Sequence, residues 1–272
     1  MPEGACDSHI HILDPRFPAR PGWPGTPVNE ATVAAYRSFQ NRIGTTRAVV
    51  VTPSTYGTDN SATLDALRQF GPAARGVAVI DCDAPPANLR EMDAAGVTGL
   101  RVNFVSPQVW GTTDVRRLRD TAAIAADMGW HIQVYARGAD IVALEGELAA
   151  LPTPLVIDHL GHVAPDPVEG HAALAAVLRL LDSGRTWVKL SGAYISSLAG
   201  PPSYRDLLPI ARSYVAAAPE RLVWGSDWPH RGQGPHWPDD AALADLLLDW
   251  VPDANLRRAI LVDNPARLYG FH

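Results

Sequence analysis

Short apolar runs recur along the chain at intervals that suit strands alternating with helices. Each run is rich in Val, Ile or Leu, and most are followed by a polar turn and then by a stretch with helical spacing. Strands that alternate with helices pair in parallel through right-handed crossovers. Eight such units predict a closed (β/α)8 TIM barrel. The runs lie at residues 5–10, 48–51, 77–80, 100–104, 132–135, 155–157, 187–190 and 222–224.

Two late segments carry one-sided apolar stripes that indicate helices packed on a core. Their apolar residues are Leu174, Val177, Leu178 and Leu181, and then Leu243, Leu246, Leu247 and Trp250. An open doubly wound sheet is the alternative fold, but no glycine fingerprint follows the first predicted strand. Because the chain has no internal repeat or linker, we expect one domain over residues 1–272. The Pro- and Gly-rich residues 15–27 are expected to form a long first loop over the barrel mouth.

The composition supports a buried core and argues against two classes of partner. Hydrophobic residues make up 47% of the 272 residues, charged residues make up 19%, and the formal net charge is −6. Nucleic acid is not an expected partner, because phosphate binding requires a basic face. No apolar run of about 18 residues is present, so no membrane span is expected. Cys6 and Cys82 are too few for a disulfide framework, and with no leader before the first predicted strand we expect a cytoplasmic protein.

Polar and ionisable side chains gather where the predicted strands end. In barrels of this class the chemistry lies at the carboxyl ends of the strands, so these side chains are expected to share one mouth. In chain order they are Asp7, His9, His11, Ser54, Asp81, Asp83, Arg101, Asn103, Gln133, Tyr135, Asp158, His159, Lys189, Ser191, Ser226 and Asp227.

The pair His9 and His11 is the sharpest local feature. Side chains two apart on a strand point to the same face, so both imidazoles can enter one cavity and bind a metal or polarise a carbonyl oxygen. The alternative is that both histidines are structural, with ring nitrogens that only form hydrogen bonds to neighbouring protein groups. Asp7 two residues earlier, and His159 at the end of another strand, favour the functional interpretation.

Asp227 follows the last predicted strand. A carboxylate there can take a proton from water; the alternative is a cap for the following turn. His159 is a candidate metal ligand or electrophile, or else a core histidine.

Arg101 is the candidate that holds a substrate carboxylate, because a guanidinium offers a bidentate fork. Its alternative is a salt bridge to a strand-end acid such as Asp81. Tyr135 and Ser54 are candidate hydrogen-bonding walls. Lys189 is expected to point into the bottom or side of the barrel as a structural ion-pair partner.

Taken together, six motifs resemble the amidohydrolase superfamily, and within it the branch of 2-pyrone-4,6-dicarboxylate lactonase and sugar-acid lactonases. The resemblance spans nearly the whole chain. The motifs are residues 7–11 (Asp-Ser-His-Ile-His), 57–60 (Gly-Thr-Asp-Asn), 157–161 (Ile-Asp-His-Leu-Gly), 188–192 (Val-Lys-Leu-Ser-Gly), 225–230 (Gly-Ser-Asp-Trp-Pro-His) and 263–271 (Asp-Asn-Pro-Ala-Arg-Leu-Tyr-Gly-Phe).

The resemblance implies a hydrolase that opens a small carboxylated lactone. Asp227 would be the general base that activates water, while His9, His11 and His159 would polarise the carbonyl and stabilise the oxyanion. The substrate-binding side chains implied are Arg101, Tyr135, Ser54, His162 and His230. A lactone isomerase, a zinc-dependent amidohydrolase or decarboxylase on the same scaffold, and a non-catalytic lactone-binding barrel are the alternatives.

The resemblance also bears on metal binding. Zinc sites of the wider superfamily often add a bridging lysine or glutamate after the fourth strand and a histidine after the fifth. This chain lacks both, since His131 begins the fifth predicted strand, so a binuclear centre is not expected. A single Zn²⁺ held by His9, His11, His159 and Asp227 is the alternative. The lactonase branch itself implies no metal, and this is the favoured expectation.

Two positions depart from the lactonase branch. Its dicarboxylate-binding members carry arginine where this chain has His162 and Ile195. The substrate is therefore expected to be a small anionic lactone with fewer carboxylates, or a hydroxylated sugar lactone, unless Arg137, His162 or Arg231 replaces the missing clamps. The sequence gives no indication of the oligomeric state.

Overall fold

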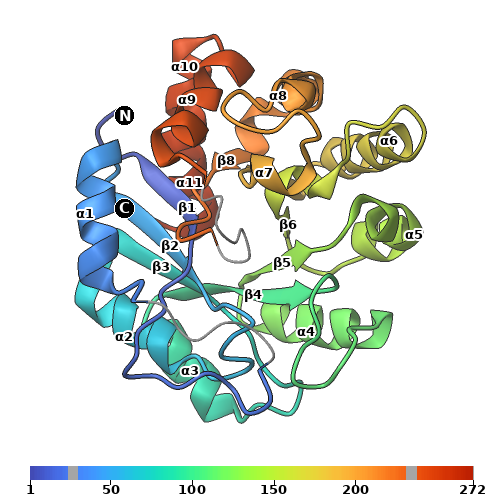
Figure 1. Ribbon diagram of the computed structural model, residues 1–272. Coiled ribbons are helices and arrows are strands. Elements are labelled where there is room, and N and C mark those ends of the chain that lie inside the picture. The colour runs from blue at the N-terminus through green and yellow to red at the C-terminus, as the bar shows by residue number, and fades with distance from the viewer. Residues whose placement is uncertain (24–29, 231–237, 272) are drawn as a thin grey trace.

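The computed structural model describes residues 1–23, 30–230 and 238–271. Eight parallel strands lie side by side in chain order, β1 to β8, and form the ring seen in Figure 1. The predicted TIM barrel is confirmed. The strands are β1 (Cys6–Ile10), β2 (Arg47–Val51), β3 (Ala74–Ala78), β4 (Val97–Asn103), β5 (His131–Tyr135), β6 (Leu155–Ile157), β7 (Thr186–Leu190) and β8 (Leu222–Trp224).

Helices surround the barrel (Figure 1). Apolar side chains on the outward faces of the strands pack with them into one large cluster, while a second cluster that includes Cys6, Val51 and Trp187 fills the interior. The α-helices are α1 (Val33–Ile43), α2 (Ser61–Phe70), α3 (Pro86–Ala94), α4 (Val115–Asp127), α5 (Gly138–Ala149), α6 (Glu169–Asp182), α7 (Ala193–Ser196), α8 (Leu208–Ala217), α9 (Asp240–Trp250), α10 (Ala254–Arg258) and α11 (Asn264–Tyr269).

The two predicted apolar stripes lie on α6 and α9. Val177 and Leu181 are buried, and Leu243 and Trp250 are buried in the same cluster. Helix α9 begins after Asp239, whose side chain accepts a hydrogen bond from the backbone N–H of Ala242 and so caps the helix. The packing interpretation of both stripes is confirmed.

Two strands begin three residues before their predicted starts, whereas the starts of the other six agree to within one residue. Strand β3 lies at Ala74–Ala78 rather than 77–80, so Asp81 and Asp83 fall in the following loop. Strand β4 begins three residues before the predicted start at 100, since its first residue is Val97. Gly76 and Gly99 interrupt the apolar pattern, yet each has a packing reason: a Cβ would come within 2.8 Å of Leu67 at Gly76 and within 2.3 Å of the His131 ring at Gly99.

The barrel closes where β1 meets the chain beyond β8. Ile10 forms a parallel bridge with Trp228. The N–H of Asp227 donates to the carbonyl of His9 at 2.9 Å, and the N–H of His11 donates to the carbonyl of Trp228 at 2.8 Å. The seam of the barrel therefore runs through residues of the candidate site.

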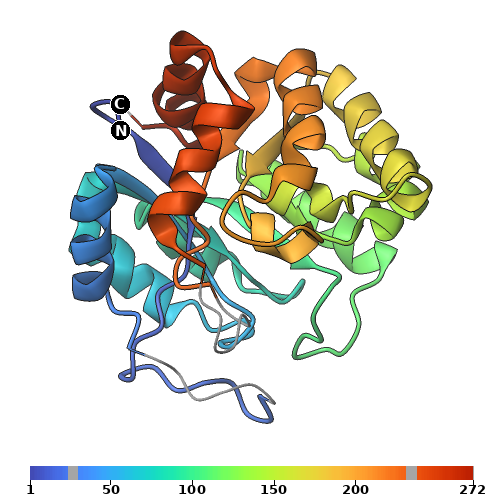
Figure 2. The same cartoon turned by 45° about the horizontal axis from the view of Figure 1, so that its top comes forward.

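The described part of the first loop contacts the loops at the carboxyl ends of β2 and β4. The N–H of Arg20 donates to the carbonyl of Thr55 at 2.8 Å, and its guanidinium donates to the carbonyl of Pro107 at 3.4 Å. Figure 2 shows this loop from a second direction. Its predicted place at the mouth is confirmed for residues 15–23, and residues 24–27 lie outside the described residues.

No helix in the described part of the chain is long and apolar enough to cross a membrane. Both cysteines are free thiols, with Cys6 buried and Cys82 half-buried.

Candidate active site

Strand β1 carries a bulge that aims its polar side chains. Along β1 the pairing advances three residues, from Asp7 to Ile10, while along β2 it advances two, from Ala48 to Val50. The extra residue lets both Ser8 and His9 face the interior, and a bulge re-aims side chains in this way. His9 and His11 therefore enter the same cavity, as the sequence predicts.

Asp7 does not join the two histidines. Its carboxylate is fully buried on the outer side of β1, where it accepts hydrogen bonds from the Ser226 N–H at 2.8 Å, the Ser226 hydroxyl at 2.6 Å and the Tyr36 hydroxyl at 3.2 Å. The expectation that Asp7 shares the mouth was wrong, because the bulge changes the alternation of faces. Asp7 instead ties β1 to the chain beyond β8.

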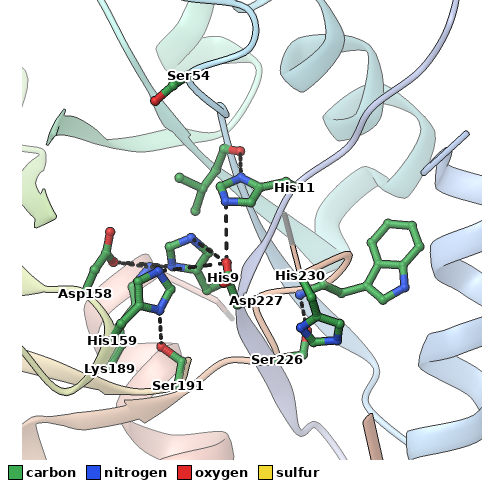
Figure 3. Close-up of polar contacts among 12 residues, drawn as sticks. His9, His11, Ser54, Asp158, His159, Lys189, Ser191, Ser226, Asp227 and His230 are labelled. Atoms are coloured by element: carbon green, nitrogen blue, oxygen red, sulfur yellow. Dashed lines mark hydrogen bonds and ion pairs between the residues drawn. The ribbon is translucent and has the colours of Figure 1, made fainter. Parts of the chain in front are cut away.

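The centre of the site is Asp227 Oδ1, which faces three imidazoles (Figure 3). It lies 3.5 Å from Nε2 of His11, 3.6 Å from Nε2 of His9 and 3.9 Å from Nε2 of His159. Asp227 itself has a left-handed backbone with φ of 61°. Such a conformation is uncommon outside glycine, and here it is held by the seam hydrogen bond to His9.

Each imidazole is held through its other nitrogen. Nδ1 of His11 bonds the carbonyl of Val51 at 2.7 Å, and Nδ1 of His159 bonds the hydroxyl of Ser191 at 2.9 Å. Nδ1 of His9 accepts from Lys189 Nζ at 3.2 Å. These partners fix the ring orientations, so all three Nε2 atoms converge on one carboxylate oxygen.

Burial sets the protonation of the cluster. It lowers the pKa of His11 to about 4, the pKa of His159 below its usual value, and the pKa of His9 well below it, so the three rings are neutral at pH 7. Burial would raise the pKa of Asp227, but the three imidazoles and a hydrogen bond from Tyr194 outweigh it and hold that pKa low. Asp227 is therefore an ionised carboxylate beside neutral imidazoles.

Lys189 points into the barrel as a buried ion-pair partner, as the sequence predicts. Its ammonium is fully buried inside the barrel directly below His9, where it donates to the carbonyl of Ser8 at 2.9 Å and to Oε1 of Gln133 at 2.8 Å. It lies 3.6 Å from Asp158, so the expected ion pair is present. Burial lowers the pKa of Lys189 to about 8.

Arg101 forms a salt bridge with Asp158 at 3.1 Å, rather than with Asp81, which pairs with Arg117. This bond uses Nε alone; no described residue accepts a hydrogen bond from the two η nitrogens of Arg101. The guanidinium lies 5.1 Å from the centre of the Tyr135 ring.

Tyr135 and His162 form an aromatic wall beside His159. The Tyr135 ring lies 5.3 Å from the His159 ring and stacks on the His162 ring at 6.0 Å. Burial raises the pKa of Tyr135 to about 12 and lowers the pKa of His162 to about 4. Residues 159–162 all have positive φ, and the Tyr214 hydroxyl holds this turn through the carbonyl of Leu160 at 3.0 Å.

Ser54 belongs to a polar group on the far side of His11 (Figure 3). Its hydroxyl accepts hydrogen bonds from Asn103 at 3.0 Å and from Gln108 at 3.2 Å. Arg137 precedes α5, and its charge acts on both Tyr135 and His162. Arg231 lies outside the described residues.

Two residues of the site were missed or underused by the sequence argument. Tyr194 donates a hydrogen bond to Asp227 Oδ2 at 2.5 Å and contacts His230 at 3.2 Å. Its signal was present, because it follows the motif at 188–192, but a tyrosine on a short helix has no strand-end position. Asp158 was placed at a strand end without a role, and it joins Arg101 to Lys189.

Two glycines allow His9 and His159 to lie close to the neighbouring backbone. A Cβ at Gly225 would come within 2.7 Å of the Cβ of His9, and a Cβ at Gly192 within 2.8 Å of Nδ1 of His159. The motifs at 188–192 and 225–230 therefore contain glycine for steric reasons.

The donor set also fits a single metal ion. Donor atoms of His9, His159 and Asp227 all lie within 4.8 Å of one another, and Nε2 of His9 is buried without a hydrogen-bond partner among the described residues. His131 is not part of this set; it lies at the amino end of β5 against Tyr269. The arrangement can thus hold one cation, or can work as an acid–base and oxyanion site.

Three curated relatives match nearly the whole chain. A 2-pyrone-4,6-dicarboxylate hydrolase of Comamonas testosteroni is 36% identical, covering 99% of this chain and 91% of its own length. A 4-sulfomuconolactone hydrolase of Hydrogenophaga intermedia is 34% identical, covering 99% and 90%. A D-galactarolactone isomerase of Agrobacterium fabrum is 33% identical, covering 99% and 92%.

A solved structure is similar to this chain over nearly its whole length as well. An Agrobacterium tumefaciens protein, crystallised in its apo form, superposes with a TM-score of 0.89 at 32% identity, covering 100% of this chain and 97% of its own. The Amidohydrolase family model matches residues 6–271. With the barrel, the strand-end histidines and the final aspartate in place, this chain belongs to the amidohydrolase family.

Proposed function

We propose that this protein hydrolyses a small carboxylated lactone. The observation that carries the proposal is the convergence of three neutral imidazoles on the ionised Asp227. It has the groups that lactone opening needs, namely a base for water and donors for the oxyanion. The activities of the related hydrolases support the same reaction class.

Hydrogen-bond polarity assigns different tasks to the histidines. His11 donates its Nδ1 proton to the Val51 carbonyl, so Nε2 of the neutral ring is an acceptor. Lys189 donates to Nδ1 of His9, which leaves the ring proton on Nε2. Asp158 lies 3.3 Å from the same Nδ1 but makes no hydrogen bond through that oxygen. His9 is therefore a donor to the site, and His11 is an acceptor.

These assignments give a balanced reaction. Water donates hydrogen bonds to Asp227 Oδ1 and His11 Nε2, and its oxygen attacks the lactone carbonyl while Asp227 takes a proton. His9 donates to the developing oxyanion, and His159 does so when Ser191 donates to its Nδ1. The bond between the carbonyl carbon and the ring oxygen then breaks, and the ring oxygen receives the proton held by Asp227. The product is an acid with a new hydroxyl or keto group.

The substrate carboxylate is assigned to Arg101. The salt bridge to Asp158 uses Nε of Arg101, so its two η nitrogens can bind a carboxylate. The Tyr135 ring lies beside the same guanidinium. Where the dicarboxylate-binding branch has arginine, His162 offers a neutral ring at pH 7. We therefore propose a substrate with one carboxylate at Arg101 and hydroxyls or neutral oxygens near Ser54 and His162.

A single Zn²⁺ is the alternative for the same site. Nε2 of His11 and Oδ1 of Asp227 are both acceptors 3.5 Å apart, a contact that a cation between them would also satisfy. His9, His11, His159 and Asp227 would hold the ion. When bound, it would polarise the lactone carbonyl as a Lewis acid.

The deciding experiment follows proton release by chelator-treated protein on a panel of carboxylated pyrones and sugar-acid lactones, with metal analysis of the same sample. Ring opening by metal-free protein is expected. Activity that disappears with the metal and returns with zinc would replace the metal-free mechanism. A shifted ring in place of an acid product would instead indicate an isomerase, the activity of one relative. No reaction on any lactone would overturn the proposal.

A further inference from the structure

A chain of hydrogen bonds runs from an outer helix to the back of Asp227. Asp240 Oδ1, in the first turn of α9, lies 2.7 Å from Nε2 of His230. Nδ1 of His230 lies 3.2 Å from the Tyr194 hydroxyl, and that hydroxyl donates to Asp227 Oδ2 at 2.5 Å. The other oxygen of Asp240 accepts from Arg42 on α1 at 2.7 Å. Apart from Asp227, none of these groups takes part in the reaction proposed above.

The polarity of the chain follows from counting protons. A tyrosine hydroxyl has one proton, and an ionised carboxylate can only accept, so Tyr194 directs its proton at Asp227. The Tyr194 oxygen can then accept a hydrogen bond from Nδ1 of His230, whose Nε2 lies 2.7 Å from Asp240 Oδ1. Both ring nitrogens of His230 therefore contact protein groups, so neither is available to bind a substrate oxygen.

The geometry divides the two oxygens of Asp227. Oδ2 is occupied by Tyr194, whereas Oδ1 faces the three imidazoles. The left-handed backbone of Asp227 does not by itself fix the side-chain torsion. A carboxylate without the hydroxyl at Oδ2 would be able to rotate and exchange its oxygens.

We propose that Tyr194, His230 and Asp240 are positioning residues that hold Asp227 in the orientation required for attack by water. The inference rests on the proposed function of Asp227 as the base. It gives His230 a positioning role in place of the substrate contact expected from the sequence. His230 acts on Asp227 through Tyr194, and Asp240 acts through His230. Because the three residues act in series, their substitutions should not have independent effects, as they would if each made only a separate structural contact.

The test is a double-mutant cycle with Tyr194→Phe and His230→Ala, measured on the best lactone substrate. Tyr194→Phe is expected to lower kcat roughly 10- to 100-fold, since it removes a hydrogen bond to a charged group, with KM within about twofold. His230→Ala should lower kcat less. The double variant should be no slower than Tyr194→Phe alone, because groups acting in series are not additive. His230→Asn should recover part of the loss, because its amide can still donate to Tyr194.

Tyr269→Phe is the matched control. It also removes a buried phenol hydroxyl, one that has no hydrogen-bond partner among the described residues, at the other end of the barrel. Its kcat should equal that of the wild type. Losses that multiply in the double variant, or that fall on KM, would overturn the serial positioning role. If Asp227→Asn kept normal activity, the proposed function would fail as well; an inactive Asp227→Asn beside a fully active Tyr194→Phe would overturn this inference alone.

Discussion

At the scale of single residues, the chemistry of the site depends on which ring nitrogen of each histidine carries the proton. The three imidazoles look equivalent in the sequence, yet a carbonyl, an ammonium and a hydroxyl hold their Nδ1 atoms. The tautomer of a histidine follows from that partner. His11 is thereby an acceptor and His9 a donor, although both lie on one strand.

Asp227→Asn should abolish turnover and leave the fold intact. Loss of a general base lowers rates by roughly 10²- to 10⁴-fold, and asparagine can still accept the hydrogen bond of Tyr194. The measurement is kcat together with the thermal midpoint of the variant. Near-normal activity would show that another group activates water.

Arg101→Lys should raise KM for a carboxylated lactone by about tenfold and leave KM unchanged for a neutral lactone. Lysine keeps a positive charge against Asp158 but loses the fork that a carboxylate recognises. Michaelis profiles on the matched pair of lactones provide the check. An equal rise for both substrates would mean that Arg101 organises the site without binding the carboxylate.

At the scale of elements, sequence periodicity predicted the barrel because each strand and helix has its own local signal. Strand–helix alternation and the two helical stripes need no long-range information. The pairing of His9 with His11 was equally readable. The bulge in β1 was not, since a one-residue change of register depends on how Asp7 meets Ser226 on another part of the chain. For the same reason Asp7 was misplaced.

Gly225→Ala should lower activity by at least about tenfold and reduce stability. The new Cβ would meet the Cβ and backbone N of His9 at 2.7 and 2.8 Å, so β1 must shift. Gly146→Ala on α5 is the control, because nothing lies within 4 Å of its Cβ, and it should stabilise the protein by up to ~1 kcal/mol. Activity and thermal midpoints of both variants test this. An active Gly225→Ala would mean that β1 accommodates the methyl group without moving His9.

At the scale of the whole molecule, His131 makes stability depend on pH. It is buried at the amino end of β5, neither ring nitrogen has a hydrogen-bond partner among the described residues, and burial lowers its pKa from 6.5 to about 3. Between those values the unfolded chain binds a proton that the folded chain does not. The contribution of His131 to stability therefore falls as pH drops from 6.5 toward 3, by about 1.4 kcal/mol per pH unit.

His131→Phe should flatten this acid dependence, because phenylalanine has no group that titrates and its aromatic ring still covers Gly99. Free energies of unfolding at pH 7, 6 and 5 for both proteins give the comparison. Identical slopes would contradict the assignment to His131.

The seam between β1 and the end of β8 has a consequence for the biosynthesis of this protein. Asp7 and Ser226 stand 219 residues apart in the chain, and Asp227 and the first two histidines lie on opposite sides of the same junction. Closing so long a loop is among the costliest contacts in folding. A nascent chain on the ribosome therefore contains His9 and His11 long before Asp227 is added. We therefore expect the candidate site to form only when this junction closes, and a chain cut before Ser226 to be inactive.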